Sequence, residues 1–269
     1  TNVYEHWEPY NDVLEISNKE KAFTVYDDKL SLDGNLILRP SGLQGGGLIN
    51  LDDSKLNSNL YSFDLHEFYS DTADFALERS DIEALAFESI NLKTKINLTD
   101  RVAQFNSNGS GSFVNFPSNK YICYIDELKW FMDKKEVVLG NDNGFGAGSK
   151  FISIHEGQDS LSFVSKSSTY NLNDYIIKAN GVDKIEVADA VISPSDGKLI
   201  IRSNAKMDKL SKASILVNKT EKYHSLYDSD IQIFGKKDYS GLGFTKYLGR
   251  GIQEQVIKLD TIYVLDNQT

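Results

Sequence analysis

The chain has 269 residues, of which 40% are hydrophobic and 25% are charged, a balance typical of globular proteins. Its formal net charge is −10 and it contains no run of Lys and Arg, which argues against nucleic acid and against anionic lipid as partners. No apolar run approaches the roughly 18 residues that a membrane-spanning helix requires, so we expect no direct membrane span. The chain starts at Thr1 without a signal peptide, so we expect either a mature chain or a piece excised from a longer protein.

The first part of the chain predicts β-strands, because apolar and polar side chains alternate along it. Leu36 and Leu38 follow the turn sequence LDGN, and a longer alternation further on predicts one half-buried strand. Ser80 and Glu83 form a capping box at the start of SDIEALAFESI, so that stretch predicts either a short helix or a strand. The apolar face of the longer alternation consists of Ile90, Leu92, Thr94, Ile96 and Leu98.

The middle of the chain contains the single cysteine and a glycine-rich loop. Cys123 lies in the apolar stretch YICYID, which indicates a buried, unreactive thiol and excludes an internal disulfide framework. Residues 125–138, IDELKWFMDKKEVV, fit a helix or a strand, and we favour a strand. The sequence GNDNGFGAGSK at 140–150 spaces its glycines as phosphate-binding loops do, but strand-like sequence follows it, which favours a hairpin loop. Calcium is the alternative ligand, with oxygen atoms from Asn141, Asp142 and Asn143.

The last third of the chain repeats the two-residue period in short segments. Turn sequences such as PSDGK and FGKKDYSGLG separate these segments. Short strands at close spacing predict an all-β protein of elongated, stacked β-layers, either solenoid-like or built of jelly-roll or sandwich repeats, with little helix. The alternating residues are Ile185 and Val187, Leu199 and Ile201, Ala213, Ile215 and Val217, Ile231 and Ile233, and Ile257 and Leu259.

A sequence motif that occurs twice supports a repeated architecture. The pattern D-G-x-L-I-x-R occurs at residues 33–39 and again at residues 196–202. If the two copies are equivalent, the glycine of each lies in a tight turn between antiparallel strands. We therefore expect one β-rich repeat region over 1–140 and a second over 141–269, or one continuous elongated domain.

Recognisable catalytic motifs are absent from the sequence. There is no nucleophile elbow, and no Cys and His are paired. The four histidines lie too far apart in sequence for a helical zinc pair, so we expect no catalytic residue and no cofactor. Tyr4, Trp7 and Tyr10 alternate with polar residues and are suited to binding sugar, which keeps a carbohydrate-binding module as an alternative. Surface or packed positions are expected for His6, His66, His155 and His224.

Several long stretches resemble very large, β-rich envelope proteins of Bacteroidetes, among them the plug-like subunits of the type 9 secretion translocon. The general character of their sequence is also similar to that of the OstA-type jelly rolls of lipopolysaccharide transport, which consist of stacked β-layers. The resemblance implies a location in the bacterial cell envelope, on the periplasmic side of the outer membrane or at the cell surface. It carries no catalytic motif. The stretches are residues 38–77, 116–136, 155–198, 205–218 and 222–244.

Three functions fit these observations. The first is a non-catalytic structural or interaction domain of a large envelope protein, which would present β-surface and open strand edges to other envelope proteins. The second is a carbohydrate-binding or carbohydrate-active module, whose sign would be a cleft with exposed aromatic side chains and carboxylates, or with Lys and Arg facing an acidic sugar. The third is a β-groove that carries lipid or another small ligand. We favour the first.

Overall fold

The computed structural model describes residues 2–109, 112–140, 148–218, 224–248 and 254–265. Of these residues, 67% lie in β-strands and 2% in short 3-10 helices, so the prediction of an all-β protein with little helix is confirmed. The strand pairs are antiparallel, and the sheet does not close on itself. The described part of the chain has no helix with the length and apolarity to cross a membrane.

The chain divides into two compact units. The first consists of Thr1–Pro117 with Ile125–Val138, and the second of Ser118–Tyr124 with Leu139–Thr269. The chain thus passes from the first unit into the second at residues 118–124, returns to the first at residues 125–138, and then continues in the second. The two units are described separately.

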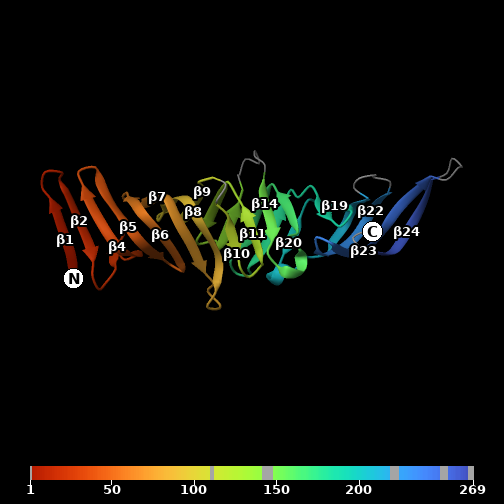
Figure 1. The fold of residues 1–269 in the computed structure, drawn as a ribbon, viewed down its shortest axis with the longest axis horizontal. Coiled ribbons are helices and arrows are strands. Elements are labelled where there is room, and N and C mark those ends of the chain that lie inside the picture. The colour runs from red at the N-terminus through yellow and green to blue at the C-terminus, as the bar shows by residue number, and fades with distance from the viewer. Residues whose placement is uncertain (1, 110–111, 141–147, 219–223, 249–253, 266–269) are drawn as a thin grey trace. The chain divides into compact units, whose positions relative to one another are not determined.

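The first unit is a meander, in which most strands pair with the next strand along the chain (Figure 1). At its start, β4 pairs along one side with β2 and, further along, with β3. At its end, β8 pairs with β10 through its first half and with β9 through its second, and β9 pairs on with β12. The strands are β1 (Val3–Glu8), β2 (Val13–Asn18), β3 (Phe23–Val25), β4 (Leu30–Arg39), β5 (Gly42–Leu51), β6 (Ser54–Phe63), β7 (Glu67–Glu78), β8 (Leu85–Asn97), β9 (Val102–Ser107), β10 (Val114–Phe116) and β12 (Glu127–Phe131), and β13 (Glu136–Leu139) lies where the units divide.

The long strands of the first unit are irregular at their middles. The register shifts between Gly45 and Gly47 on β5 and between Ser70 and Ala73 on β7, and Asn91 on β8 has a φ of 55°. Such bulges bend a strand and increase its twist. On β8 the irregularity at Asn91 falls between Ser89, which pairs with β10, and Leu92, which pairs with β9, so the two halves of this strand have different partners.

The bend between β4 and β5 depends on glycine. Gly34 and Gly47 are opposite each other in the register, and a Cβ added at Gly34 would lie 2.9 Å from the Cα of Gly47 and against the backbone oxygen of Gly46. A Cβ added at Gly47 would lie 2.8 Å from the Cα of Gly34. Only residues without a side chain allow the two backbones to approach this closely.

Buried serine hydroxyl groups lie beside the bends of β6 and β7. Ser58 Oγ lies 2.8 Å from Ser70 Oγ and donates to the carbonyl oxygen of Thr72 at 2.6 Å. Ser58 Oγ also accepts from the backbone N–H of Leu60 at 3.1 Å. Bulged residues lose their ladder partners, and these hydroxyl groups supply replacement hydrogen bonds inside the protein.

Aromatic side chains fill the first unit. Phe75 on β7 packs against Phe105 on β9 with ring centroids 4.6 Å apart, and against Trp130 on β12 at 5.7 Å. Tyr61 and Phe68 form a T-shaped pair further along the same interior. Through these contacts Phe75 joins β7 to β9 and β12 within the core of the unit.

The second unit contains two sets of paired strands. One set runs through β11, β14, β15, β18, β19, β21, β22, β23 and β24, and the other through β16, β17 and β20. Their bounds are β11 (Tyr121–Tyr124), β14 (Ser149–Ser153), β15 (Ser162–Ser165), β16 (Ser167–Asn171), β17 (Ile176–Asn180), β18 (Ile185–Val187), β19 (Ala190–Ser193), β20 (Leu199–Ile201), β21 (Leu210–Val217), β22 (His224–Gly235), β23 (Asp238–Leu248) and β24 (Glu254–Tyr263), with the 3-10 helices η1 (Glu156–Gln158) and η2 (Ser203–Ala205).

Buried amide side chains tie the two sets of strands together. Asn119, just before β11, donates from Nδ2 to the carbonyl oxygens of Tyr175 at 2.9 Å and Ile201 at 3.3 Å. Gln158 accepts from the Tyr121 hydroxyl at 2.9 Å and donates to the carbonyl oxygen of Ala205 at 2.7 Å. These bonds satisfy backbone groups that the sheet ladders leave unpaired.

The local predictions had mixed outcomes. Of the two alternatives for residues 80–90, the helix is wrong, because residues 80–84 form bends, and the strand is right from Leu85 onward, where β8 begins. The two D-G-x-L-I-x-R copies are not equivalent: Gly34 lies inside β4, whereas Gly197 lies in a turn, with its N–H donating to the Pro194 carbonyl at 3.2 Å. Residues 125–138 form β12 and β13, so the preference for strand there is confirmed.

Candidate functional sites

The first candidate site is the outer edge of β1. Within the described residues, β1 pairs on one side only, with β2. The backbone N–H of Lys19 donates to the carbonyl oxygen of Asn2 at 3.3 Å, and hydrogen-bonded pairs alternate along an antiparallel ladder. Tyr4 and His6 therefore direct their backbone groups to β2, and Glu5 directs its own away from the sheet.

The apolar interior of the first unit opens towards this edge. Trp7 is opposite Leu14, which is opposite Leu38, so these three side chains share the face that carries the buried Phe63 and Tyr61 further into the sheet. Trp7 is 53% exposed and Leu38 is 51% exposed, whereas Tyr61 is fully buried. The core of the first unit is thus incompletely covered beside β1.

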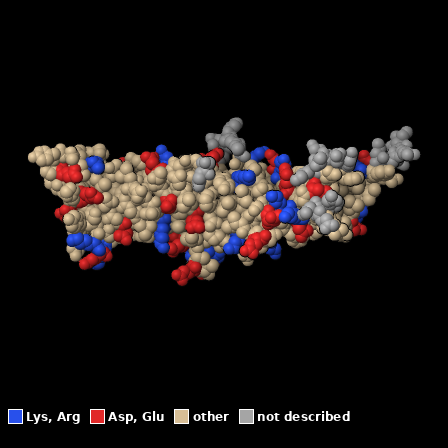
Figure 2. Space-filling model, in the orientation of Figure 1, with Lys and Arg blue, Asp and Glu red and all other residues tan. Residues whose placement is uncertain are grey.

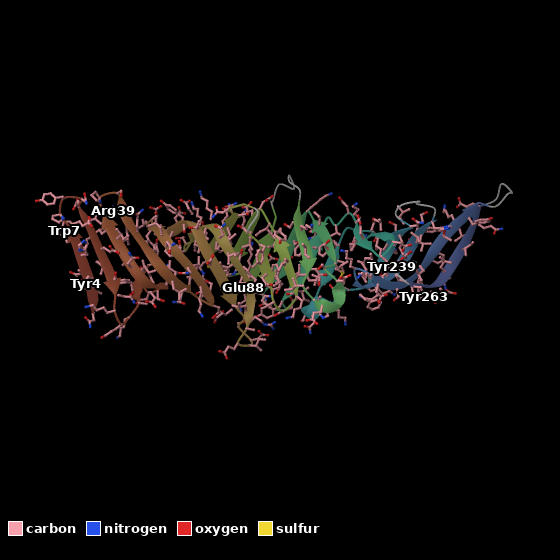
Figure 3. All side chains as sticks on the ribbon, viewed as in Figure 1. Tyr4, Trp7, Arg39, Glu88, Tyr239 and Tyr263 are labelled. Atoms are coloured by element: carbon pink, nitrogen blue, oxygen red, sulfur yellow. The ribbon has the colours of Figure 1, made fainter. Side chains whose placement is uncertain are left out.

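Polar and aromatic side chains border the same edge. Tyr4 projects from the opposite face of β1 and is 64% exposed, and Figure 3 shows it with Trp7 and Arg39 at this end of the unit. The side chain of Asn11 donates to Glu8 at 2.9 Å and, with smaller contributions from His6 and Arg39, lowers the pKa of that carboxyl. The edge therefore carries an ionised carboxylate beside exposed aromatic rings.

A second edge lies in the other unit. Among the described residues β24 pairs with β23 alone. Val256 and Tyr263 are more than half exposed, and Figure 3 labels Tyr263 at this edge. The inner-facing Ile262 is buried, so β24 belongs to the folded core along part of its length only.

The second candidate site is a groove of about 600 Å³ in the second unit. Its floor is formed by β14 and β15, where Lys150 is opposite Val164 on the outer face and Phe151 is opposite Phe163 in the core. The hairpin between β22 and β23 contributes Lys236, held by hydrogen bonds of its backbone to Gln158 and Ala188. The lining residues are Gly148, Lys150, Ser162, Phe163, Val164, Lys166, Gly181, Asp183, Lys184, Glu186 and Lys236.

Positive charge predominates in this groove. Four lysines and two carboxylates line it, which gives a formal charge of +2 in a chain whose net charge is −10. Lys166 lies 3.5 Å from Asp183, and Lys184 lies 3.4 Å from Glu186. All four of these side chains are more than half exposed, so within each pair the carboxylate attracts the lysine only weakly in water.

Elsewhere the charges are mixed in sign. In the face shown in Figure 2, Lys and Arg side chains lie among Asp and Glu side chains. Close to the groove, Lys237 lies 2.5 Å from Asp159 and lowers the pKa of that carboxyl, with a smaller contribution from Lys236. The local excess of lysine in the groove therefore contrasts with an acidic chain.

The residues that the sequence singled out do not assemble into one centre. His6 lies on β1, His66 between β6 and β7, and His224 on β22, while His155 accepts the N–H of Gly157 at its Nδ1, 3.0 Å away. No group of three His, Cys, Asp or Glu side chains suited to a metal ion occurs among the described residues. The calcium candidates Asn141, Asp142 and Asn143 lie outside the described residues.

Cys123 is fully buried, as predicted, and its burial raises the pKa of the thiol well above the ordinary range. No sequence pattern indicated the groove, because its lysines come from four separate segments and none lies in a basic run. Lys150 and Glu186 stand at polar positions of alternating strands, which any solvent-facing residue would occupy.

Comparison of the chain with protein-family models, with curated proteins and with solved structures finds no match.

Proposed function

We propose that the chain is a non-catalytic scaffold domain of a large bacterial envelope protein, and that it binds other envelope proteins by strand addition. The observation that carries this proposal is the edge of β1, where one side of the strand has backbone groups directed away from the sheet. An extended segment of a partner can pair with such an edge and continue the sheet. The envelope location rests on the sequence resemblance.

The open interior beside β1 supports the same proposal. A strand added next to β1 would place alternate side chains beside Trp7 and cover part of its apolar surface, which is now half exposed. Backbone hydrogen bonds would give affinity, and the fit around Trp7 would give selectivity. Glu5 lies on this same face, so a partner with Lys or Arg opposite it would be favoured over a second copy.

The proposal is tested with edge variants as baits. Glu5→Pro removes an N–H that points away from β2 and keeps the ladder between β1 and β2, and proline is tolerated on edge strands. Glu5→Ala is the matched control, because it removes the same carboxylate and keeps the N–H. Both variants and the unchanged chain are immobilised and exposed to an envelope extract from a Bacteroidetes bacterium.

The expected result is a set of proteins retained by the unchanged chain and by Glu5→Ala but lost with Glu5→Pro. Hydrogen exchange with the purified partner should then slow at the backbone amides of Glu5 and Trp7. If Glu5→Pro retains the same proteins as the control, or if nothing is retained by any bait, strand addition at β1 is wrong.

A further inference from the structure

The lysine-lined groove has the properties of a site for an anionic ligand. Lys150 and Lys236 approach it from β14 and from the hairpin after β22, and the described residues place no carboxylate within ion-pairing distance of either side chain. Neither ammonium group is therefore held in a close ion pair by these residues, although the charge of Lys236 also acts on Asp159. Lysine ammonium groups bind carboxylate and phosphate oxygens as mobile point charges.

The paired strands beneath the groove restrict how a ligand can bind. β14 pairs with β11 and β15, and β15 pairs with β14 and β18. The backbone groups of β14 are used within the sheet on both sides, whereas β15 is joined to β18 through the pair Phe163–Ile185 alone. For a ligand the groove offers side-chain ammonium groups, two carboxylates and the hydroxyl of Ser162.

The position of Lys166 shows how the groove is shaped. A Cβ added at Gly181 would lie 2.8 Å from both the Cβ and the Cδ of Lys166, so the stem of that lysine lies against the bare backbone of Gly181. The φ of Gly181 is 67°, a conformation in which glycine is favoured. The glycine thus lets the lysine side chain run along the floor of the groove towards Asp183.

We propose that this groove binds an acidic oligosaccharide of the uronate type. Such a ligand carries a carboxylate on each sugar for the lysines, and many hydroxyl groups that can donate to Asp183 and Glu186. Single-stranded nucleic acid fits less well, because it is bound by exposed aromatic platforms and the phenylalanine in the lining is buried. The proposal is independent of strand addition at β1, which lies in the other unit.

Titration calorimetry of the full chain with hexagalacturonate tests the proposal, with maltohexaose as the neutral control. Binding of the acidic hexamer only is expected, and it should weaken as the salt concentration rises. The double variant Lys150→Gln/Lys236→Gln should weaken it by about tenfold or more, because each lysine makes a hydrogen bond to a charged group. Lys55→Gln/Lys93→Gln removes two charges from the first unit and should change the affinity by less than about twofold.

The possible outcomes separate the alternatives. Equal binding of maltohexaose, or equal weakening by both double variants, would show that the groove lysines do not select the ligand. Hexaglutamate or a short oligodeoxynucleotide that binds as tightly as hexagalacturonate, with the same dependence on Lys150 and Lys236, would overturn the saccharide assignment. Absence of binding to hexagalacturonate, with an unchanged thermal unfolding curve for the variants, would overturn the proposal altogether.

Discussion

Replacing Gly47 by alanine should destabilise the first unit more than the same replacement at Gly42. Both glycines lie on β5 and both have positive φ, 126° and 137°. A Cβ at Gly42 has nothing within 4 Å, whereas a Cβ at Gly47 would meet the backbone oxygen of Asp33 and lie 2.8 Å from the Cα of Gly34. The pair of variants therefore separates the conformational cost from the steric cost.

The magnitude follows from these two costs. Holding a residue with a side chain in a sparsely populated backbone conformation costs about 1–3 kcal/mol, and both variants bear this cost. The overlap at Gly47 involves backbone atoms, which cannot rotate away as a side chain can, and forced overlap of this kind costs a further 1–3 kcal/mol, roughly. We expect Gly47→Ala to be less stable than Gly42→Ala by that second amount.

Urea unfolding followed by tryptophan fluorescence measures the difference. Trp130 is buried in the same unit and should report its unfolding, while Trp7 is already half exposed and should change little. A Trp7→Phe background removes the residual signal. If the two alanine variants differ by less than about 0.5 kcal/mol, which is within the effect of an ordinary surface substitution, the close approach of β4 and β5 is not a source of constraint.

Three further predictions concern the second unit. Asn119→Ala should lower the free energy of unfolding by about 1–3 kcal/mol, because it removes a buried donor to two carbonyl groups, and a loss below about 0.5 kcal/mol in urea unfolding would contradict this reasoning. Cys123 should resist a thiol-labelling reagent in the folded protein and react on unfolding, because it is buried and its pKa is raised; rapid labelling without urea would refute its burial. Arg202 lowers the pKa of Asp208 through hydrogen bonds of 2.6 and 2.8 Å. The pair therefore contributes to the free energy of unfolding above the ordinary carboxyl pKa of about 3.9, and this contribution to stability is lost as the pH falls below that value. In a plot of melting temperature against pH, Asp208→Asn should therefore make the fall on the acid side slightly less steep. An unchanged fall would show that this exposed pair contributes nothing measurable to stability.

Alternation in the sequence predicted where strands form better than it predicted which side chains of a strand are buried. Along β8, Leu92, Thr94 and Ile96 are buried as predicted, but Ile90 is 49% exposed. The bulge at Asn91 adds one residue and reverses which side chains point inward. A period of two cannot reveal such a reversal, because residues on both sides of it still alternate.

The turn signal failed at Gly34 for a related reason. Asp-Gly is common in hairpin turns, yet this glycine lies within β4, where the neighbouring backbone passes too close for a side chain. Glycine serves both needs, and the sequence of one strand does not show how near its neighbour lies. The GGG stretch at 45–47 was the available signal, because a run of glycines inside an alternating strand indicates a bulge or a close approach.

The groove was missed because it exists only after folding. Lys150 and Lys184 are 34 positions apart in sequence and meet through the pairing of β14, β15 and β18. The chain average, which is acidic, pointed away from a cationic site. Local charge depends on which strands become neighbours, and that information lies in the register rather than in the composition.

The order in which strands pair in the first unit has a consequence for how the protein folds. From β4 to β9 each strand pairs with the next one along the chain, so each of these pairings joins two segments that follow each other in sequence. Folding rates fall as the mean separation of contacting residues grows, and all-β sandwiches with distant pairings are slow for this reason. This meander can instead grow by one strand at a time from any hairpin, and a chain leaving the ribosome can complete each addition before the next strand has been synthesised.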